Sequence, residues 1–69
     1  MTEHWHHLKN GAVMHRFTQT APGEGIVLAH TPGDWVTWVI DIETGNTFWG
    51  DYQRTYEQAL ESFNKRVAA

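Results

Sequence analysis

The stretch WVTWVIDI, residues 35–42, decides the fold of this chain. Every residue in it except Asp41 is β-branched or aromatic, which is the composition that favours a strand. Residues 43–45 (ETG) follow it and can turn the chain back into a second strand over residues 46–50 (NTFWG). These residues therefore predict an antiparallel strand pair joined by a three-residue loop.

Two further segments extend the pattern upstream. Residues 26–30 (IVLAH) form a short apolar run that ends at a turn signal, TPGD, over residues 31–34. Residues 20–25 (TAPGEG) predict a loop, because proline cannot donate to a strand ladder and glycine permits positive φ. We therefore expect a three-stranded sheet over residues 26–51.

The N-terminal region predicts a separate hairpin over residues 4–18. Apolar and polar residues alternate on both sides of Asn10 and Gly11, and Asn-Gly is the preferred pair for a two-residue type I′ turn. That turn would place His6 opposite His15, with His4 two residues along on the same face.

The apolar period changes from two to that of a helix over residues 55–67. Thr55 and Gln58 fit a capping box, in which the threonine hydroxyl accepts from the amide of residue 58 and the glutamine side chain reaches back to the cap. One apolar stripe follows, made of Tyr56, Ala59, Leu60, Phe63 and Val67. The predicted fold class is α+β: a small antiparallel meander of three to five strands with one C-terminal helix on one face.

Length and composition set the class of protein. The 69 residues make a single domain, and the 41% hydrophobic and 19% charged fractions are those of a globular chain. No cysteine is present, and no run is long and apolar enough to span a bilayer. We expect a soluble cytoplasmic protein, in the host cytoplasm if a phage encodes it.

The predicted strand pair has two apolar faces. A three-residue loop would pair Ile40 with Phe48 and Trp38 with Gly50. The face on which we expect the helix to dock then holds Val36, Trp38, Ile40, Ile42 and Phe48. The other face holds Trp35, Thr37, Val39, Asp41, Thr47 and Trp49, and it is too apolar to be an ordinary solvated face.

Two interpretations of this second face stay open. The N-terminal hairpin or a second copy of the chain covers it, or it binds a partner, since exposed tryptophans rimmed by polar residues mark interaction sites. On the second interpretation the partner-binding residues are Trp35, Thr37, Val39, Thr47 and Trp49.

Residues 33–59 also carry a family-like pattern. A tryptophan strand, a glycine turn at 43–46, a strand that ends in Gly-x-aromatic at 50–52 and a helix start at 55–59 (TYEQA) follow in order. The pattern, which covers residues 26–67, resembles the three-strand-plus-helix module of AP2 domains and of phage integrase arm-binding domains. The resemblance implies a free sheet face that enters the major groove, and so a DNA-binding regulator as the alternative function. The net charge of −3 and the absence of Arg and Lys from the Trp35 face disfavour DNA.

The five histidines are candidates for metal binding only if three of them converge. His4, His6 and His15 are the candidate set, but half-buried strand positions explain them more simply, and we expect no metal and no cofactor. Repulsion between protonated His6 and His15 predicts that the hairpin loosens on acidification.

No catalytic motif emerges from the chain. The single serine, Ser62, has no histidine at local spacing, and there is no glycine-rich phosphate loop. We therefore predict a non-enzymatic interaction protein that acts through its aromatic sheet face, either as a homodimer or on another protein. Its size, the lack of cysteine and the integrase-like pattern resemble a phage or mobile-element accessory protein that modulates a host protein.

Overall fold

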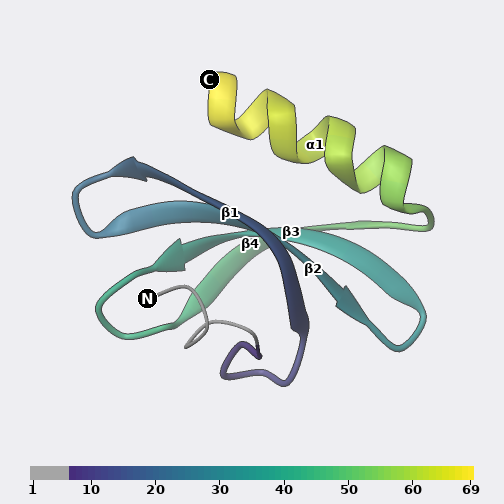
Figure 1. Cartoon of the computed structure of the whole chain (residues 1–69), viewed down its shortest axis with the longest axis horizontal. Helices are drawn as coiled ribbons and strands as arrows, with labels where there is room; N and C mark the ends of the chain where they lie inside the picture. Colours follow the sequence, from purple (N-terminus) through teal and green to yellow (C-terminus); the bar gives the residue numbers. More distant parts are fainter. Residues whose placement is uncertain (1–6) are drawn as a thin grey trace.

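The computed structural model describes residues 7–69, which form one antiparallel sheet and one helix (Figure 1). The sheet is a meander in the order β1-β2-β3-β4, and the C-terminal helix lies across one of its faces. This confirms the predicted fold class, and the helix lies within a residue of its predicted bounds. The elements are β1 (Val13–Ala21), β2 (Glu24–Thr31), β3 (Asp34–Asp41), β4 (Thr47–Gln53) and α1 (Tyr56–Ala68).

Two Pro-Gly turns connect the first three strands. Pro22-Gly23 links β1 to β2 and Pro32-Gly33 links β2 to β3, with φ of 75° at Gly23 and 106° at Gly33. Proline sets the first φ and glycine supplies the positive second φ, so two residues suffice for each reversal. The loop predicted over residues 20–25 is therefore too long, and β1 belongs to the same sheet as β2–β4 rather than to a separate hairpin.

The chain reverses before β1 through a turn of three residues instead of the predicted two. The amide of Leu8 donates to the carbonyl of Ala12 at 2.9 Å, and the amide of Gly11 donates to the carbonyl of Leu8 at 2.9 Å. Asn10 accepts from the amide of Ala12 through its side chain, and His7 bridges Val13. The register at His7 thus differs by one residue from the prediction. The predicted strand positions 4–6 lie outside the described residues.

The helix packs on the Trp35 face of the sheet, so the predicted docking face is wrong. Ala59 and Phe63 are buried in a cluster with residues of β2 and β3, and the rest of the helix stripe packs against its margin. The sheet side of this cluster consists of Ile26, Leu28 and Val39, with the half-buried Trp35 beside them.

The opposite face forms a second core under the N-terminal segment. Leu8 and Ala12 are buried here, and Met14 and Phe17 pack at the margin. The sheet residues that they cover are Val27, Ala29, Val36, Trp38 and Ile40. Because both sheet faces are covered by apolar side chains, β2 and β3 read as continuous apolar runs rather than as alternating ones.

The register between β3 and β4 changes at a bulge. Ile40 pairs with Thr47 and Val39 with Phe48, whereas Thr37 pairs with Asp51 in the register that was predicted. The loop after Asp41 is longer than three residues. The carboxylate of Asp41 accepts from the amides of Glu43 and Thr44, and the amide of Asp41 donates to the carbonyl of Asn46. This one-residue shift moves Phe48 to the helix side of the sheet.

The start of α1 follows the capping prediction in part. The amide of Gln58 donates to Oγ1 of Thr55 at 3.1 Å. The side-chain oxygen of Gln58 accepts from the amide of Arg54, one residue before the cap, instead of from the cap itself. Two of the amides at the helix entrance are thereby satisfied.

Candidate functional site: the aromatic edge of the sheet

The five predicted partner-binding residues do not share one exposed face. Thr37 is fully buried, Val39 is buried, and Trp35 is half-buried against α1. These three residues lie under the helix. The helix therefore covers the surface that was predicted to bind a partner. The prediction fails for them because the helix docks on this face.

The other two predicted residues lie on β4. Thr47 is half-buried and accepts a hydrogen bond from the side chain of Asn10 at 3.2 Å, which ties β4 to the turn before β1. Trp49 is 72% exposed. Of the predicted set, Trp49 alone presents a large apolar surface to solvent.

Trp49 belongs to an exposed aromatic group that we name the aromatic edge, made of Phe48, Trp49 and Tyr52. They are the large hydrophobic side chains that stand exposed on the described part of the chain, at 38%, 72% and 57%. The rings of Phe48 and Trp49 meet edge to face at 5.3 Å, and Tyr52 meets the buried Trp38 edge to face at 6.0 Å. All three come from β4, the last strand in the sheet order.

Trp49 holds a backbone conformation that few large residues adopt. Its φ is 58°, and it is the sole non-glycine residue with positive φ among residues 7–69. It sits with Gly50 in the bulge, where two residues of β4 oppose Trp38 alone. Bulky residues at such φ values cost of order 1–3 kcal/mol and persist where surrounding contacts hold them, often at functional sites.

The helix supplies one of those contacts. Arg66 donates from Nη2 to the carbonyl of Trp49 at 2.6 Å and from Nη1 to the carbonyl of Thr37 at 3.3 Å. The guanidinium therefore bridges β3 and β4 at the bulge. Charged hydrogen bonds of this kind contribute more than neutral ones, and this pair fixes the direction of the peptide that follows Trp49.

Gly50 supplies the other contact. A Cβ at this position would lie 2.7 Å from Nε1 of Trp38 and 2.8 Å from Cε1 of Tyr52. Glycine is required here because two aromatic rings pack directly onto the backbone. The buried Trp38 therefore packs against the bulge on the face of the sheet opposite to Arg66.

A polar network under α1 completes the support of β4. Ser62 donates to the carboxylate of Asp51 at 2.5 Å, and its oxygen lies 3.1 Å from Oγ1 of Thr37. A carboxylate only accepts, so the hydroxyl proton of Ser62 goes to Asp51 and that of Thr37 goes to Ser62. A hollow of about 450 Å³ beside this network is lined by Asp51, Gln53, Gln58, Glu61, Ser62, Lys65 and Arg66. In the sequence, the one signal for this network is a small polar residue, Ser62, beside the helix stripe.

The same features discourage the addition of another strand to β4. A bulge twists an edge away from regular pairing, and the carbonyl of Trp49 already accepts from Arg66. The edge therefore offers side chains rather than a regular row of backbone groups.

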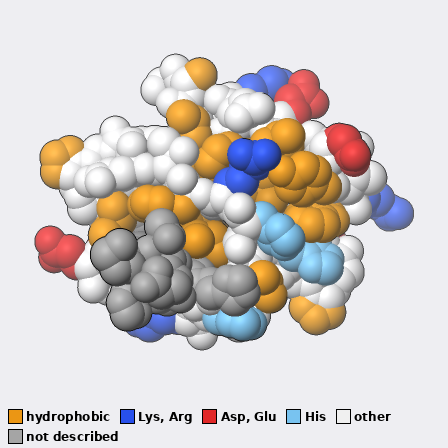
Figure 2. Space-filling view, in the orientation of Figure 1, with side chains coloured by type: hydrophobic (Ala, Val, Ile, Leu, Met, Phe, Trp, Pro, Cys, Tyr) orange, Lys and Arg blue, Asp and Glu red, His pale blue; other side chains and the backbone are white. Residues whose placement is uncertain are grey.

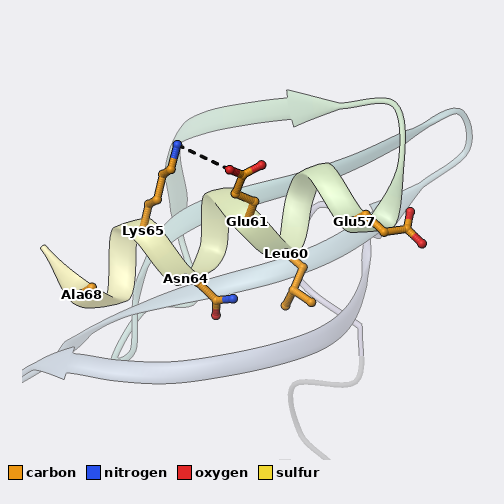
Figure 3. Close-up of a pocket in the computed structure, with 6 residues that line it drawn as sticks. All are labelled: Glu57, Leu60, Glu61, Asn64, Lys65 and Ala68. Atoms are coloured by element: carbon orange, nitrogen blue, oxygen red, sulfur yellow. Dashed lines mark ion pairs between the residues drawn. The ribbon is translucent and has the colours of Figure 1, made fainter.

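The outer side of α1 carries a shallow hollow with no comparable chemistry. Figure 3 shows Leu60 and Asn64 on one side of the helix and the ion pair of Lys65 with Glu61 on another, at 3.7 Å. All six lining residues come from this one helix. Both charged partners are largely exposed, so the pair stabilises the fold little.

The candidate metal set of three histidines lies only in part within the described residues. His15 lies on β1, while His4 and His6 lie outside residues 7–69. Within those residues no three His, Cys, Asp or Glu side chains gather closely enough to hold a metal ion. The expectation that His4, His6 and His15 bind no metal therefore stays a prediction.

Comparison with known proteins adds no family. No protein family, curated protein or solved structure matches the chain. Among residues 7–69, no helix has the length and apolar character that a bilayer crossing requires.

Proposed function

We propose that this chain is a non-catalytic protein-binding module that contacts its partner through the aromatic edge, with Trp49 as the central anchor. The observation that carries the proposal is Trp49 itself, an indole 72% exposed and held at a φ of 58°. Nothing in the packing of the fold requires a tryptophan at this position, because most of its surface touches solvent. Binding to a partner supplies a reason for the strained residue.

The chemistry of the edge indicates the kind of partner. Tryptophan and tyrosine are enriched among the residues that dominate protein interfaces, where they fill apolar pockets on the other protein. Phe48 contacts Trp49, so these two rings form one exposed patch. Tyr52 pairs with Val36 and packs on Trp38, so its exposed ring lies toward the other face of the same edge strand. We infer a protein partner with an apolar pocket for the indole and a rim that receives Phe48.

The test compares three chains: wild type, Trp49→Gly and Asn64→Ala. Glycine keeps the positive φ of the bulge and removes the indole, while Asn64 is an exposed helix residue away from β4. Each chain is first run by size exclusion with light scattering, to detect a second copy as the partner. Each is then used to capture proteins from an extract of the source cells, followed by titration of the purified candidate.

We expect wild type and Asn64→Ala to bind the same protein, or to self-associate, with equal affinity, and Trp49→Gly to bind at least tenfold more weakly. Equal binding by all three chains would overturn the proposal. A mixed-sequence DNA duplex at low salt is the last titrant. A saturable complex with DNA that survives Trp49→Gly would instead favour the DNA-binding alternative.

A further inference from the structure

A second group of exposed side chains lies on the helix side of the sheet, away from the aromatic edge. His15 and Arg16 come from β1 and His30 from β2. Trp35 of β3 and Tyr56 of α1 lie beside them. Figure 2 shows histidine side chains against a hydrophobic patch on this view of the molecule, with a Lys or Arg side chain over the same patch. We name His15, Arg16 and His30 the basic triad.

A bulge in β1 brings two members of the triad to the same side. Met14 pairs with Ala29 and Arg16 pairs with Leu28, so His15 is the extra residue. Leu28 belongs to the core under the helix, which places Arg16 on the helix side. His15 nevertheless also reaches Trp35, at 4.8 Å between ring centroids. Bulges re-aim a side chain in this way and are common next to functional sites.

Aromatic rings hold the imidazoles in place. His30 stacks on Trp35 at 4.3 Å with an interplanar angle of 30°, and Trp35 contacts Tyr56 at 5.1 Å. His15 and His30 lie 6.2 Å apart. Both imidazoles therefore pack against the indole of Trp35, while His15 and His30 stay exposed.

Arg16 is oriented by a neutral partner rather than by an acid. Its Nε donates to the hydroxyl of Tyr56 at 2.9 Å, which leaves the other edge of the guanidinium fork toward solvent. No hydrogen bond or ion pair of residues 7–69 joins a carboxylate to the triad. Asp34 precedes Trp35 in the sequence and Glu57 follows Tyr56, yet neither carboxylate pairs with a member of the basic triad. Although the chain has a net charge of −3, none of the carboxylates within residues 7–69 is bonded to these three basic groups.

We propose that the basic triad binds a phosphate group. An imidazole N–H group binds a phosphate oxygen at about 2.7–2.9 Å. Two imidazoles can therefore share one oxygen when their ring centroids are up to roughly 8 Å apart. The distance of 6.2 Å between the centroids of His15 and His30 lies within this range. The free edge of Arg16 then donates to a second oxygen. Arg16 disfavours a divalent cation at the same place.

The test is an amide-resolved NMR titration with inorganic phosphate at constant ionic strength and pH 6.0. The variants are Arg16→Gln and the double variant His15→Asn with His30→Asn. Arg54→Gln and Lys65→Gln are the controls, since each removes one exposed cation outside the triad. Phosphoserine is titrated in parallel, to separate a phosphorylated side chain from free phosphate as the source.

We expect saturable shifts at residues 15, 16, 30 and 35 of the wild-type chain. Arg16→Gln and the double histidine variant raise the Kd at least tenfold, while both controls and Trp49→Gly leave it unchanged. Tighter binding of phosphoserine than of phosphate identifies a phosphorylated protein as the source. Linear shifts, equal effects of Arg54→Gln, or saturable shifts with Zn²⁺ but not with phosphate would overturn the proposal.

Discussion

Trp35 and Trp49 are predicted from the sequence as neighbours on one binding face, and the structure separates them. Trp35 lies under the start of α1, in contact with His15, His30 and Tyr56. Trp49 stands on the edge strand with most of its surface in solvent and touches Phe48. The same residue type thus serves packing in one place and presents a free surface in the other.

The difference lies in what surrounds each residue rather than in the strand that carries it. Trp35 is in regular pairing with His30 and Gln53, and its ring fills space between the helix and the sheet. Trp49 is in a bulge, with its carbonyl held by Arg66. A backbone that is strained and supported around an exposed side chain is more informative about function than exposure alone.

The largest expected effect is on stability, from truncation of the two tryptophans. Trp35→Ala removes packing under α1 and should lower the free energy of unfolding by about 3 kcal/mol. Trp49→Ala should lower it by less than about 1 kcal/mol, as for other surface substitutions. Urea denaturation followed by circular dichroism measures both. Similar losses for the two variants would remove the contrast between the packed and the exposed tryptophan.

The next effect concerns the polar network that supports β4. Ser62→Ala leaves the hydroxyl of the fully buried Thr37 without its acceptor and should cost about 1–3 kcal/mol. Thr37→Val removes that hydroxyl in a nearly isosteric way and leaves Ser62 bonded to Asp51, so it should cost less. The two variants are compared in the same denaturation assay. A larger loss for Thr37→Val would show that the assigned donor direction is wrong.

Removal of the helix cap should have a smaller effect. Thr55→Ala deletes the acceptor for the amide of Gln58 and should cost about 1 kcal/mol. Thr55→Ser keeps the acceptor oxygen and serves as the control. The cap at Thr55 affects both tryptophans. Helix α1 carries Tyr56, which lies beside Trp35, and Arg66, which binds the carbonyl of Trp49.

The smallest effect on stability has the opposite sign. Trp49→Gly relieves the positive φ and should leave the free energy of unfolding unchanged or raise it by up to about 1 kcal/mol. Thermal denaturation of Trp49→Gly is compared with that of Trp49→Ala, which keeps the backbone strain. The difference between the two variants measures the contribution of the positive φ to the free energy of unfolding. A clear loss of stability for the glycine variant would mean that the indole has a packing role.

Much of the fold follows from local sequence. The helix is predicted within one residue because a cap and a 3.6-residue stripe coincide at Thr55. The β3 strand is predicted because seven β-formers follow one another with one interruption. Turn lengths were harder: each Pro-Gly pair makes a two-residue reversal, and the longer loop after Asp41 depends on its carboxylate binding the backbone amides of Glu43 and Thr44.

The site was less accessible to sequence reasoning. Of the predicted partner-binding residues, Trp49 alone is strongly exposed, and Tyr52 was not among them. The β4 bulge shifts the register by one residue, and that shift reverses the face of Phe48. The contact of His15 with His30 was also missed, because it depends on a second bulge, in β1.

The sequence by itself determined the central strand and its neighbours, where the helix begins and that both faces of residues 35–42 are apolar. Only the tertiary structure decided which face the helix covers and which aromatic rings stay exposed. Propensity and period are properties of neighbouring residues. Because both faces of residues 35–42 are apolar, burial favours neither, and the outcome rests on distant contacts. Leu8 and Ala12 cover one face, while Ser62 and Arg66 bind the polar groups at the other.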